Sequence, residues 1–228
     1  GQRRPAPHAP ILPLAPRAPA RYPASMRLSW IGGVLAALLG AVVVASVLGL
    51  GPLNPRNVGW MLLGPLGPDT VQIWLGRGYF EQVPWLWPPG ANPMWGIELA
   101  SGIFYTDSNP FLLFLFKALR GLVDVPQFAG PWMLLCGLLQ GWLGWRLVGL
   151  ATRDPLARFC GAGLMALQPV WMNRMSGHVH MVAQWTLLAA LLLALAPGGG
   201  TWRRIAWVVL VTLTSLFNPY LFIMVALL

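Results

Sequence analysis

The stretch that decides the fold is LSWIGGVLAALLGAVVVASVLGL, residues 28–50. It carries no charged side chain, and as an α-helix it would be about 34 Å long, enough to cross a hydrocarbon core of about 30 Å. It is too long for the apolar core of a signal peptide and has no clear small-residue cleavage site. We therefore expect a retained transmembrane helix.

Further apolar runs follow the first along the chain. They cover residues 128–150, 156–172, 180–196, 202–217 and 219–228, and we expect the last to be a truncated span. Hydrophobic residues make up 57% of the chain and charged residues only 9%, against roughly 25% charged in a soluble domain. The sequence predicts an all-α, polytopic membrane protein, with residues 28–228 forming the N-terminal part of a multi-span domain.

Residues 1–27 differ from the rest in composition. Prolines recur through residues 1–25 without an apolar period, so this segment cannot bury enough surface to offset its ordering entropy. We expect the natural protein to begin at Met26, with a disordered or extraneous segment before it. The formal net charge is +9, but the basic residues are scattered and form no stripe along which phosphates could lie, so no nucleic-acid partner is expected.

The side on which each connection lies depends on the short apolar run 111–123. If this run does not cross the membrane, Arg174 lies alone on the outer side, and the cytoplasmic connections hold the remaining late arginines, which are Arg146, Arg153, Arg158, Arg203 and Arg204. A crossing run would reverse that distribution, and basic residues favour the cytoplasmic side. We therefore expect 111–123 to lie along the outer interface as an amphipathic helix, within an outer loop of residues 51–127, and the N-terminus to be cytoplasmic.

The predicted outer loop contains five of the six acidic residues of the chain. Asp69, in Gly-Pro-Asp-Thr, precedes a helical pattern, and Asp107 precedes the predicted interfacial helix. Each carboxylate is therefore a candidate helix cap and also a candidate catalytic group, and the two roles are compatible.

Later span ends add polar side chains to the same outer side. These candidates are Arg174, His178, His180, Asn218 and Tyr220. Arg174 has an alternative role, because a cationic side chain at a span end can also reach lipid headgroups. The spacing of the two histidines is a weak metal signal, since residues two apart point to different faces of a helix. No nucleophile elbow, P-loop or zinc-protease pattern is present.

Several motifs together resemble the GT-C glycosyltransferases, multi-pass enzymes that use polyprenyl-phosphate sugars, and an uncharacterised bacterial membrane family related to them. The motifs are Gly67-Pro68-Asp69, Leu75-Gly76-Arg77-Gly78-Tyr79-Phe80, Trp87-Pro88-Pro89-Gly90, Thr106-Asp107-Ser108-Asn109-Pro110 with Lys117, and residues 174–180. The resemblance implies a transmembrane helix bundle whose long first outer loop carries interfacial helices. It also implies that Asp69 acts at the acceptor or a metal and that Arg174 holds the lipid-linked phosphate. The chain has a single acid, Asp69 beside Thr70, where the family usually has an adjacent pair.

The expected function is sugar transfer from a polyprenyl-phosphate donor to a glycan, lipid or protein acceptor at the outer face of the cytoplasmic membrane. Asp69 would be the base and Asp107 would orient the acceptor, because a carboxylate can take the acceptor's proton. The expected substrate-binding residues are Lys117, Arg174, His178, His180, Asn218 and Tyr220. No cofactor is expected, since the ligand spacing does not support a divalent metal. A transporter or flippase of lipid-linked glycan and a structural envelope-assembly protein are the alternatives.

Overall fold

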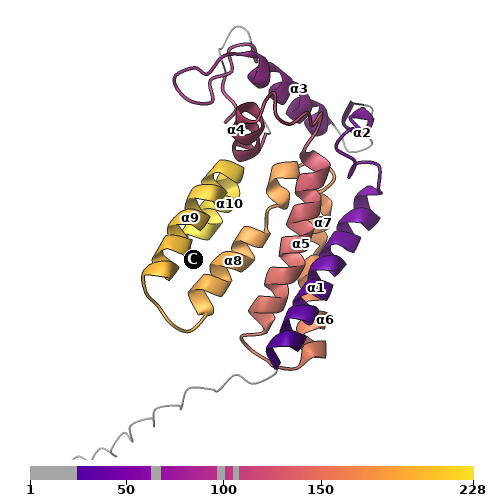
Figure 1. Ribbon diagram of the computed structural model, residues 1–228, viewed down its shortest axis with the longest axis vertical. Coiled ribbons are helices and arrows are strands. Elements are labelled where there is room, and N and C mark those ends of the chain that lie inside the picture. The colour runs from indigo at the N-terminus through magenta and orange to yellow at the C-terminus, as the bar shows by residue number, and fades with distance from the viewer. Residues whose placement is uncertain (1–24, 63–67, 97–100, 105–107) are drawn as a thin grey trace, which may run out of the picture.

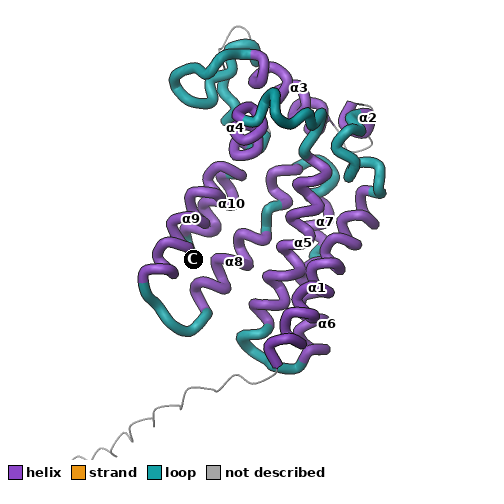
Figure 2. Tube along the Cα trace, in the orientation of Figure 1, coloured by secondary structure: helices purple, strands orange, loops and turns teal. Residues whose placement is uncertain are grey.

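The computed structural model describes residues 25–62, 68–96, 101–104 and 108–228. The described part of the chain is helical and contains no strand, apart from an isolated bridge between Ala91 and Gly102. The all-α class predicted from the sequence is therefore confirmed for these residues. Figure 2 shows long helices joined by loops that gather mainly at the two ends of the molecule.

The helices form a bundle with a smaller helical layer across one end (Figure 1). The bundle consists of α1 (Ser25–Leu48), α5 (Ala129–Val148), α6 (Pro155–Ala166), α7 (Pro169–Arg174), the 3₁₀ turn η1 (Val179–Val182), α8 (Trp185–Leu195), α9 (Thr201–Phe217) and α10 (Pro219–Ala226). The layer across its end consists of α2 (Gly59–Leu62), α3 (Pro68–Gln82) and α4 (Pro110–Ala118). The segment 1–24, which covers most of the predicted N-terminal extension, lies outside the described residues.

Helices α1 and α5 pack with their backbones in contact. A Cβ added at Gly40 would lie 1.9 Å from the carbonyl oxygen of Gly137, and a Cβ at Gly141 would lie 1.9 Å from that of Ala36. Ala36 and Gly40 are four residues apart on one helix, as are Gly137 and Gly141 on the other. Small residues at this spacing let two helices approach closely, as they commonly do inside membranes.

The predicted run 156–172 is broken into α6 and α7. Pro169 has no N–H group, so the carbonyl of Met165 loses its usual donor one turn later in the helix. The side chain of Gln140, buried on α5, supplies the missing bond, because its Nε2 donates to the Met165 oxygen at 3.2 Å. The break is thus stabilised from the neighbouring helix.

The predicted run 180–196 also changes along its length. It begins as the 3₁₀ turn η1 and becomes α-helical only at Trp185. Two indoles from neighbouring helices bind carbonyl oxygens of η1: Trp132 Nε1 donates to Val179 at 3.2 Å and Trp171 Nε1 to Val182 at 2.9 Å. These bonds keep η1 in a separate conformation from α8.

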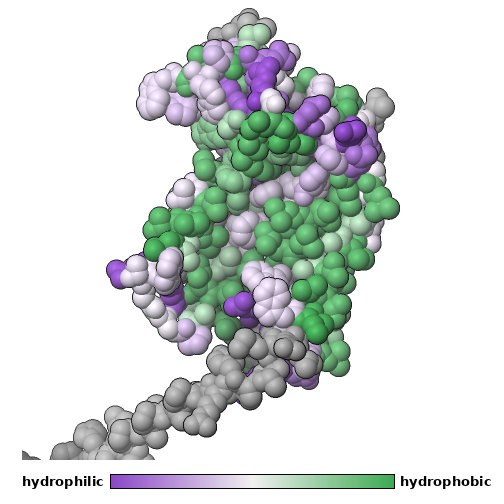
Figure 3. Space-filling view, in the orientation of Figure 1, coloured by the Kyte–Doolittle hydropathy of each residue, from purple (hydrophilic) through white to green (hydrophobic). Residues whose placement is uncertain are grey.

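Apolar side chains cover the middle of the bundle, as Figure 3 shows for one face. Exposed apolar residues occur along α1, α9 and α10, among them Leu38, Val208 and Ile223. Among the described helices, α1 alone is long and apolar enough by itself to cross a membrane, over Trp30–Leu48. Helix α4 has nine residues, about 14 Å of helix, and lies across the end of the bundle.

Candidate carboxylate–imidazole site

Asp69 and His178 meet at the end of the bundle that carries α3 and α4. Asp69 lies in the first turn of α3, and His178 lies between α7 and η1. The Oδ2 of Asp69 is 3.4 Å from the Nδ1 of His178, and their side chains are 34% and 41% exposed. The fold therefore brings together two of the predicted site residues that lie far apart in the sequence, and leaves both accessible from outside.

The start of α3 is held by the residue next to Asp69. Thr70 is fully buried, and its Oγ1 donates to the carbonyl oxygen of Met61 in α2 at 3.0 Å. Asp69 is the acidic residue of the first turn of α3, where the helix dipole makes negative charge favourable. Helix stabilisation and an outward-facing carboxylate are thus compatible at this position.

The segment around His178 is fixed by its backbone and by the indoles that bind η1. The N–H of His178 donates to the carbonyl oxygen of Arg174 at 3.0 Å, which places Arg174 one turn away. Val179, the next residue, is buried, and its carbonyl accepts the Trp132 bond described above. His178 is therefore attached to a rigid part of the bundle.

Arg174 and His180 complete the surroundings of this pair. Arg174 ends α7 and is half-buried, and none of the described carboxylates forms an ion pair with it. The ring of His180 is buried and nearly perpendicular to that of His178, with 6.4 Å between ring centres. The site thus combines a carboxylate and two imidazoles, and Arg174 lies one helical turn before His178 in the chain.

Lys117 lies elsewhere, beneath the C-terminal end of α3. Its Nζ donates to the carbonyl oxygens of Phe80 at 2.8 Å and Pro84 at 3.3 Å, and lies 3.9 Å from the centre of the Phe80 ring. Burial lowers the pKa of Lys117, Arg120 lowers it further, and Glu81 raises it. In this arrangement the ammonium group binds α3 to α4.

Asn218 and Tyr220 lie at the junction of α9 and α10. Asn218 is buried, and its Oδ1 accepts from the backbone N–H groups of Tyr220 and Leu221 at 2.9 and 3.2 Å, so it caps α10. The Tyr220 side chain is exposed. Asp107 lies outside the described residues, and the N-cap of the following helix, α4, is Asn109.

A partly buried ion pair on α3, Arg77–Glu81, is not among the functional residues predicted from the sequence. Arg77 Nε donates to Glu81 Oε1 at 2.6 Å, and the guanidinium lies 5.1 Å from the ring centres of Phe116 and Phe128. Its Nη1 is buried without a hydrogen-bond partner. The spacing of four residues between Arg77 and Glu81 is the sequence signal for such a helical pair.

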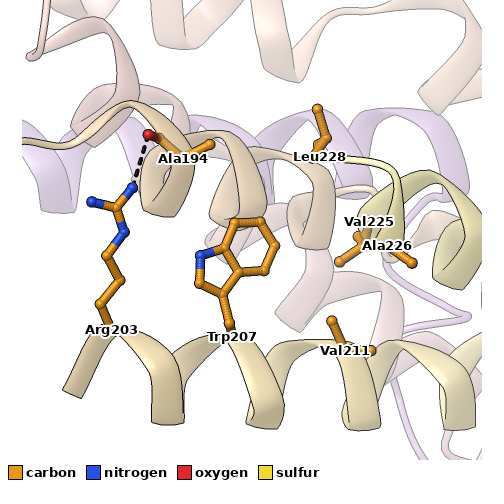
Figure 4. A pocket seen from close by; sticks show the side chains of 7 residues that line it. All are labelled: Ala194, Arg203, Trp207, Val211, Val225, Ala226 and Leu228. Carbon is orange, nitrogen blue, oxygen red and sulfur yellow. Dashed lines mark hydrogen bonds between the residues drawn. The ribbon is translucent and has the colours of Figure 1, made fainter. Parts of the chain in front are cut away.

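The opposite end of the bundle has a cleft of about 380 Å³ between α8, α9 and α10 (Figure 4). Its one charged lining residue, Arg203, donates from Nη2 to the carbonyl oxygen of Ala194 at 2.9 Å and from Nη1 to that of Ala196 at 3.2 Å. The guanidinium therefore caps the C-terminal end of α8. As for metals, the described residues contain no group of three or more His, Cys, Asp or Glu side chains that could hold an ion.

The fold and site define an all-α bundle with a carboxylate–imidazole pair at one end. The chain belongs to the DUF6311 family, a domain of unknown function, whose model matches residues 37–228. Comparison with curated proteins and with solved structures found no match.

Proposed function

We propose that the chain is a polytopic protein of the cytoplasmic membrane with α3 and α4 on its outer face. The apolar side chains exposed along α1, α9 and α10 support the location in a membrane, because lipid is the solvent in which such surfaces are stable. The distribution of charge supports it as well: Arg146 ends α5, and Arg203 and Arg204 begin α9, all at the end opposite α3. Basic residues at that end favour a cytoplasmic location.

We further propose that the protein transfers a sugar from a polyprenyl-phosphate donor to an acceptor at the outer face. The observation that carries this proposal is the contact between Asp69 and His178, with Arg174 one turn away. Glycosyl transfer needs a group that accepts the proton of the acceptor hydroxyl, and the Asp69–His178 pair can take it. It also needs positive charge near the departing phosphate, which the half-buried Arg174 can supply.

The proposal gives different roles to the other predicted site residues, which are Asp107, Lys117, Asn218 and Tyr220. Asp107 stays a candidate for orienting the acceptor. Tyr220 is exposed at the start of α10 and is available to a substrate. Lys117 and Asn218 support the site indirectly, since their polar groups bind carbonyl oxygens of α3 and N–H groups of α10.

The test uses the full chain reconstituted in lipid vesicles with polyprenyl phosphate carrying radiolabelled glucose or mannose. We expect label to leave the donor, and Asp69→Asn to abolish that transfer while the protein is still expressed. Asp124→Asn is the matched control, because Asp124 is an exposed carboxylate at the same end of the bundle. Full activity of Asp69→Asn would overturn the role of Asp69. If the donor moves between leaflets and no sugar is transferred, the proposed enzymatic function is wrong and a flippase function is favoured.

A further inference from the structure

We propose that the atom which takes the acceptor's proton is Nε2 of His178, and that Asp69 orients and stabilises the imidazole. This inference rests on the proposed transferase function and assigns the chemistry within its site. It starts from the direction of the ring: Nδ1, not Nε2, faces Asp69 Oδ2 at 3.4 Å. The two nitrogens lie on different sides of an imidazole, so Nε2 points away from the carboxylate.

A carboxylate beside Nδ1 decides which nitrogen can act as a base. It favours the tautomer with the proton on Nδ1, and the lone pair is then on Nε2. The same carboxylate stabilises the imidazolium that forms when Nε2 takes a second proton, as in the Ser-His-Asp arrangement. The 41% exposure of the His178 side chain leaves room for a substrate hydroxyl to approach.

The general chemistry of the two kinds of side chain also favours an imidazole as the base. An unperturbed imidazole titrates near pH 6.5 and an aspartate near 3.9. A general base is most effective when its pKa lies near the working pH, so an imidazole is better matched than a carboxylate to neutral conditions. Asp69 then serves the reaction through its charge and its position at the start of α3.

The transfer step balances with these groups alone. The acceptor oxygen forms a bond to the anomeric carbon as its proton passes to Nε2 of His178. The bond between that carbon and the phosphate oxygen breaks, and the electron pair leaves with the polyprenyl phosphate. The imidazolium is stabilised by Asp69, and the phosphate charge by Arg174.

Other charged and titratable groups near His178 also affect the stability of its imidazolium form. Arg174, at the end of α7, disfavours the imidazolium because it carries the same charge, whereas Asp69 on α3 favours it. His180 in η1 presents a second ring at 6.4 Å between centres. Asp107 precedes α4 in the sequence and lies outside the described residues.

The pH dependence of kcat/KM for the wild-type chain in vesicles tests this assignment without any substitution. We expect activity to rise with pH through about 6 to 7, as an imidazole loses its proton. A rise centred near pH 4 would identify a carboxylate as the base and overturn the inference, while the transferase function would stand. If the wild-type chain transfers no sugar, the proposed function itself fails.

Two variants sharpen the test. His178→Asn keeps an N–H donor near the place of Nδ1 and removes Nε2, so kcat should fall by roughly 10²- to 10⁴-fold. Binding of unlabelled polyprenyl phosphate by this variant should stay within about twofold of wild type, which shows that it is folded. Asp69→Asn should abolish transfer as well, because it removes the carboxylate that orients the imidazole through Nδ1. A folded His178→Asn chain with wild-type kcat would contradict the proposal.

Discussion

In the α1–α5 pair the two backbones touch at glycines, whereas α3 and α4 are joined by cationic side chains that reach backbone carbonyls. The first contact places Gly40 directly against the backbone of Gly137. The second uses Lys117, which donates to Phe80 and Pro84, and Arg120, whose Nη1 donates to the carbonyl of Glu81. Helix pairs in lipid gain stability from close packing, while helix ends near water can use cations at their carbonyls. The difference is consistent with the proposed topology, in which α1 and α5 lie in lipid and the ends of α3 and α4 lie near water.

The largest expected change in the free energy of unfolding comes from adding one methyl group to the α1–α5 contact, compared with adding one to α3. Gly141→Ala places a Cβ 1.9 Å from the Ala36 carbonyl oxygen, so the helices must separate, at a cost of about 3 kcal/mol. Gly78→Ala, in α3, adds a Cβ that meets nothing within 4 Å and should stabilise by up to about 1 kcal/mol. The free energy of unfolding in mixed micelles measures both. Equal effects at the two glycines would contradict the close α1–α5 contact.

A smaller loss in the free energy of unfolding is expected when one partner of the α3 ion pair is removed. Glu81→Ala leaves the buried Arg77 guanidinium without its partner, and should cost about 2 kcal/mol because the Glu81 side chain is partly exposed. Arg77→Met places an apolar side chain between Phe116 and Phe128 and should cost less. Denaturant titration of the two variants, read by circular dichroism, ranks them. The reverse ranking would show that the pair stabilises α3 through attraction alone.

Within the bundle, the hydrogen bond of Gln140 should contribute less to the free energy of unfolding than the α3 ion pair does. Gln140→Leu leaves the Met165 carbonyl without its donor, and should cost about 1 kcal/mol, in the range of interhelical hydrogen bonds in membranes. Gln72→Leu is the matched control, because Gln72 is exposed on α3. Hydrogen exchange around the α6–α7 break should increase in the first variant only. Unchanged exchange there would show that Gln140 does not stabilise the break.

The smallest effect is a pH dependence at Lys117. The pKa of Lys117 in the folded chain is below the usual 10.5. Between these two pKa values the unfolded chain therefore binds more protons than the folded chain does. The free energy of unfolding should therefore increase over that interval and become level above it. Lys117→Met should remove this increase. Unfolding titrations at a series of alkaline pH values compare the two proteins, and identical slopes would contradict the burial of a charged ammonium.

The sequence was sufficient for the helices whose pattern is local. The charge-free run 28–50 predicts α1, which begins three residues earlier at Ser25, and 128–150 predicts α5 within two residues at each end. The break at Pro169 carries a visible signal, but its stabilisation by Gln140 depends on packing between two helices. Hydrophobicity alone therefore predicts one long run there.

The candidate site could be predicted only in part. Span ends place Asp69 and His178 on one side of the bundle, but their contact depends on the break after α7 and on the indole bonds to η1. The sequence predicts Lys117 as a substrate-binding residue, because nothing near it in the sequence indicates that it is buried. Its partners, Phe80 and Pro84, lie more than thirty residues earlier.

The contact between Asp69 and His178 can be tested most directly by cross-linking. Cysteines replace Asp69 and His178 in a chain whose Cys136 and Cys160 are changed to alanine, and membranes are treated with a short, membrane-impermeant bifunctional thiol reagent. We expect an intramolecular link between positions 69 and 178, found by mass spectrometry, and none in a control that pairs Asp69→Cys with Arg203→Cys at the opposite end. Two cysteines that each react but are never linked, or that react from opposite sides of the membrane, would contradict a shared site.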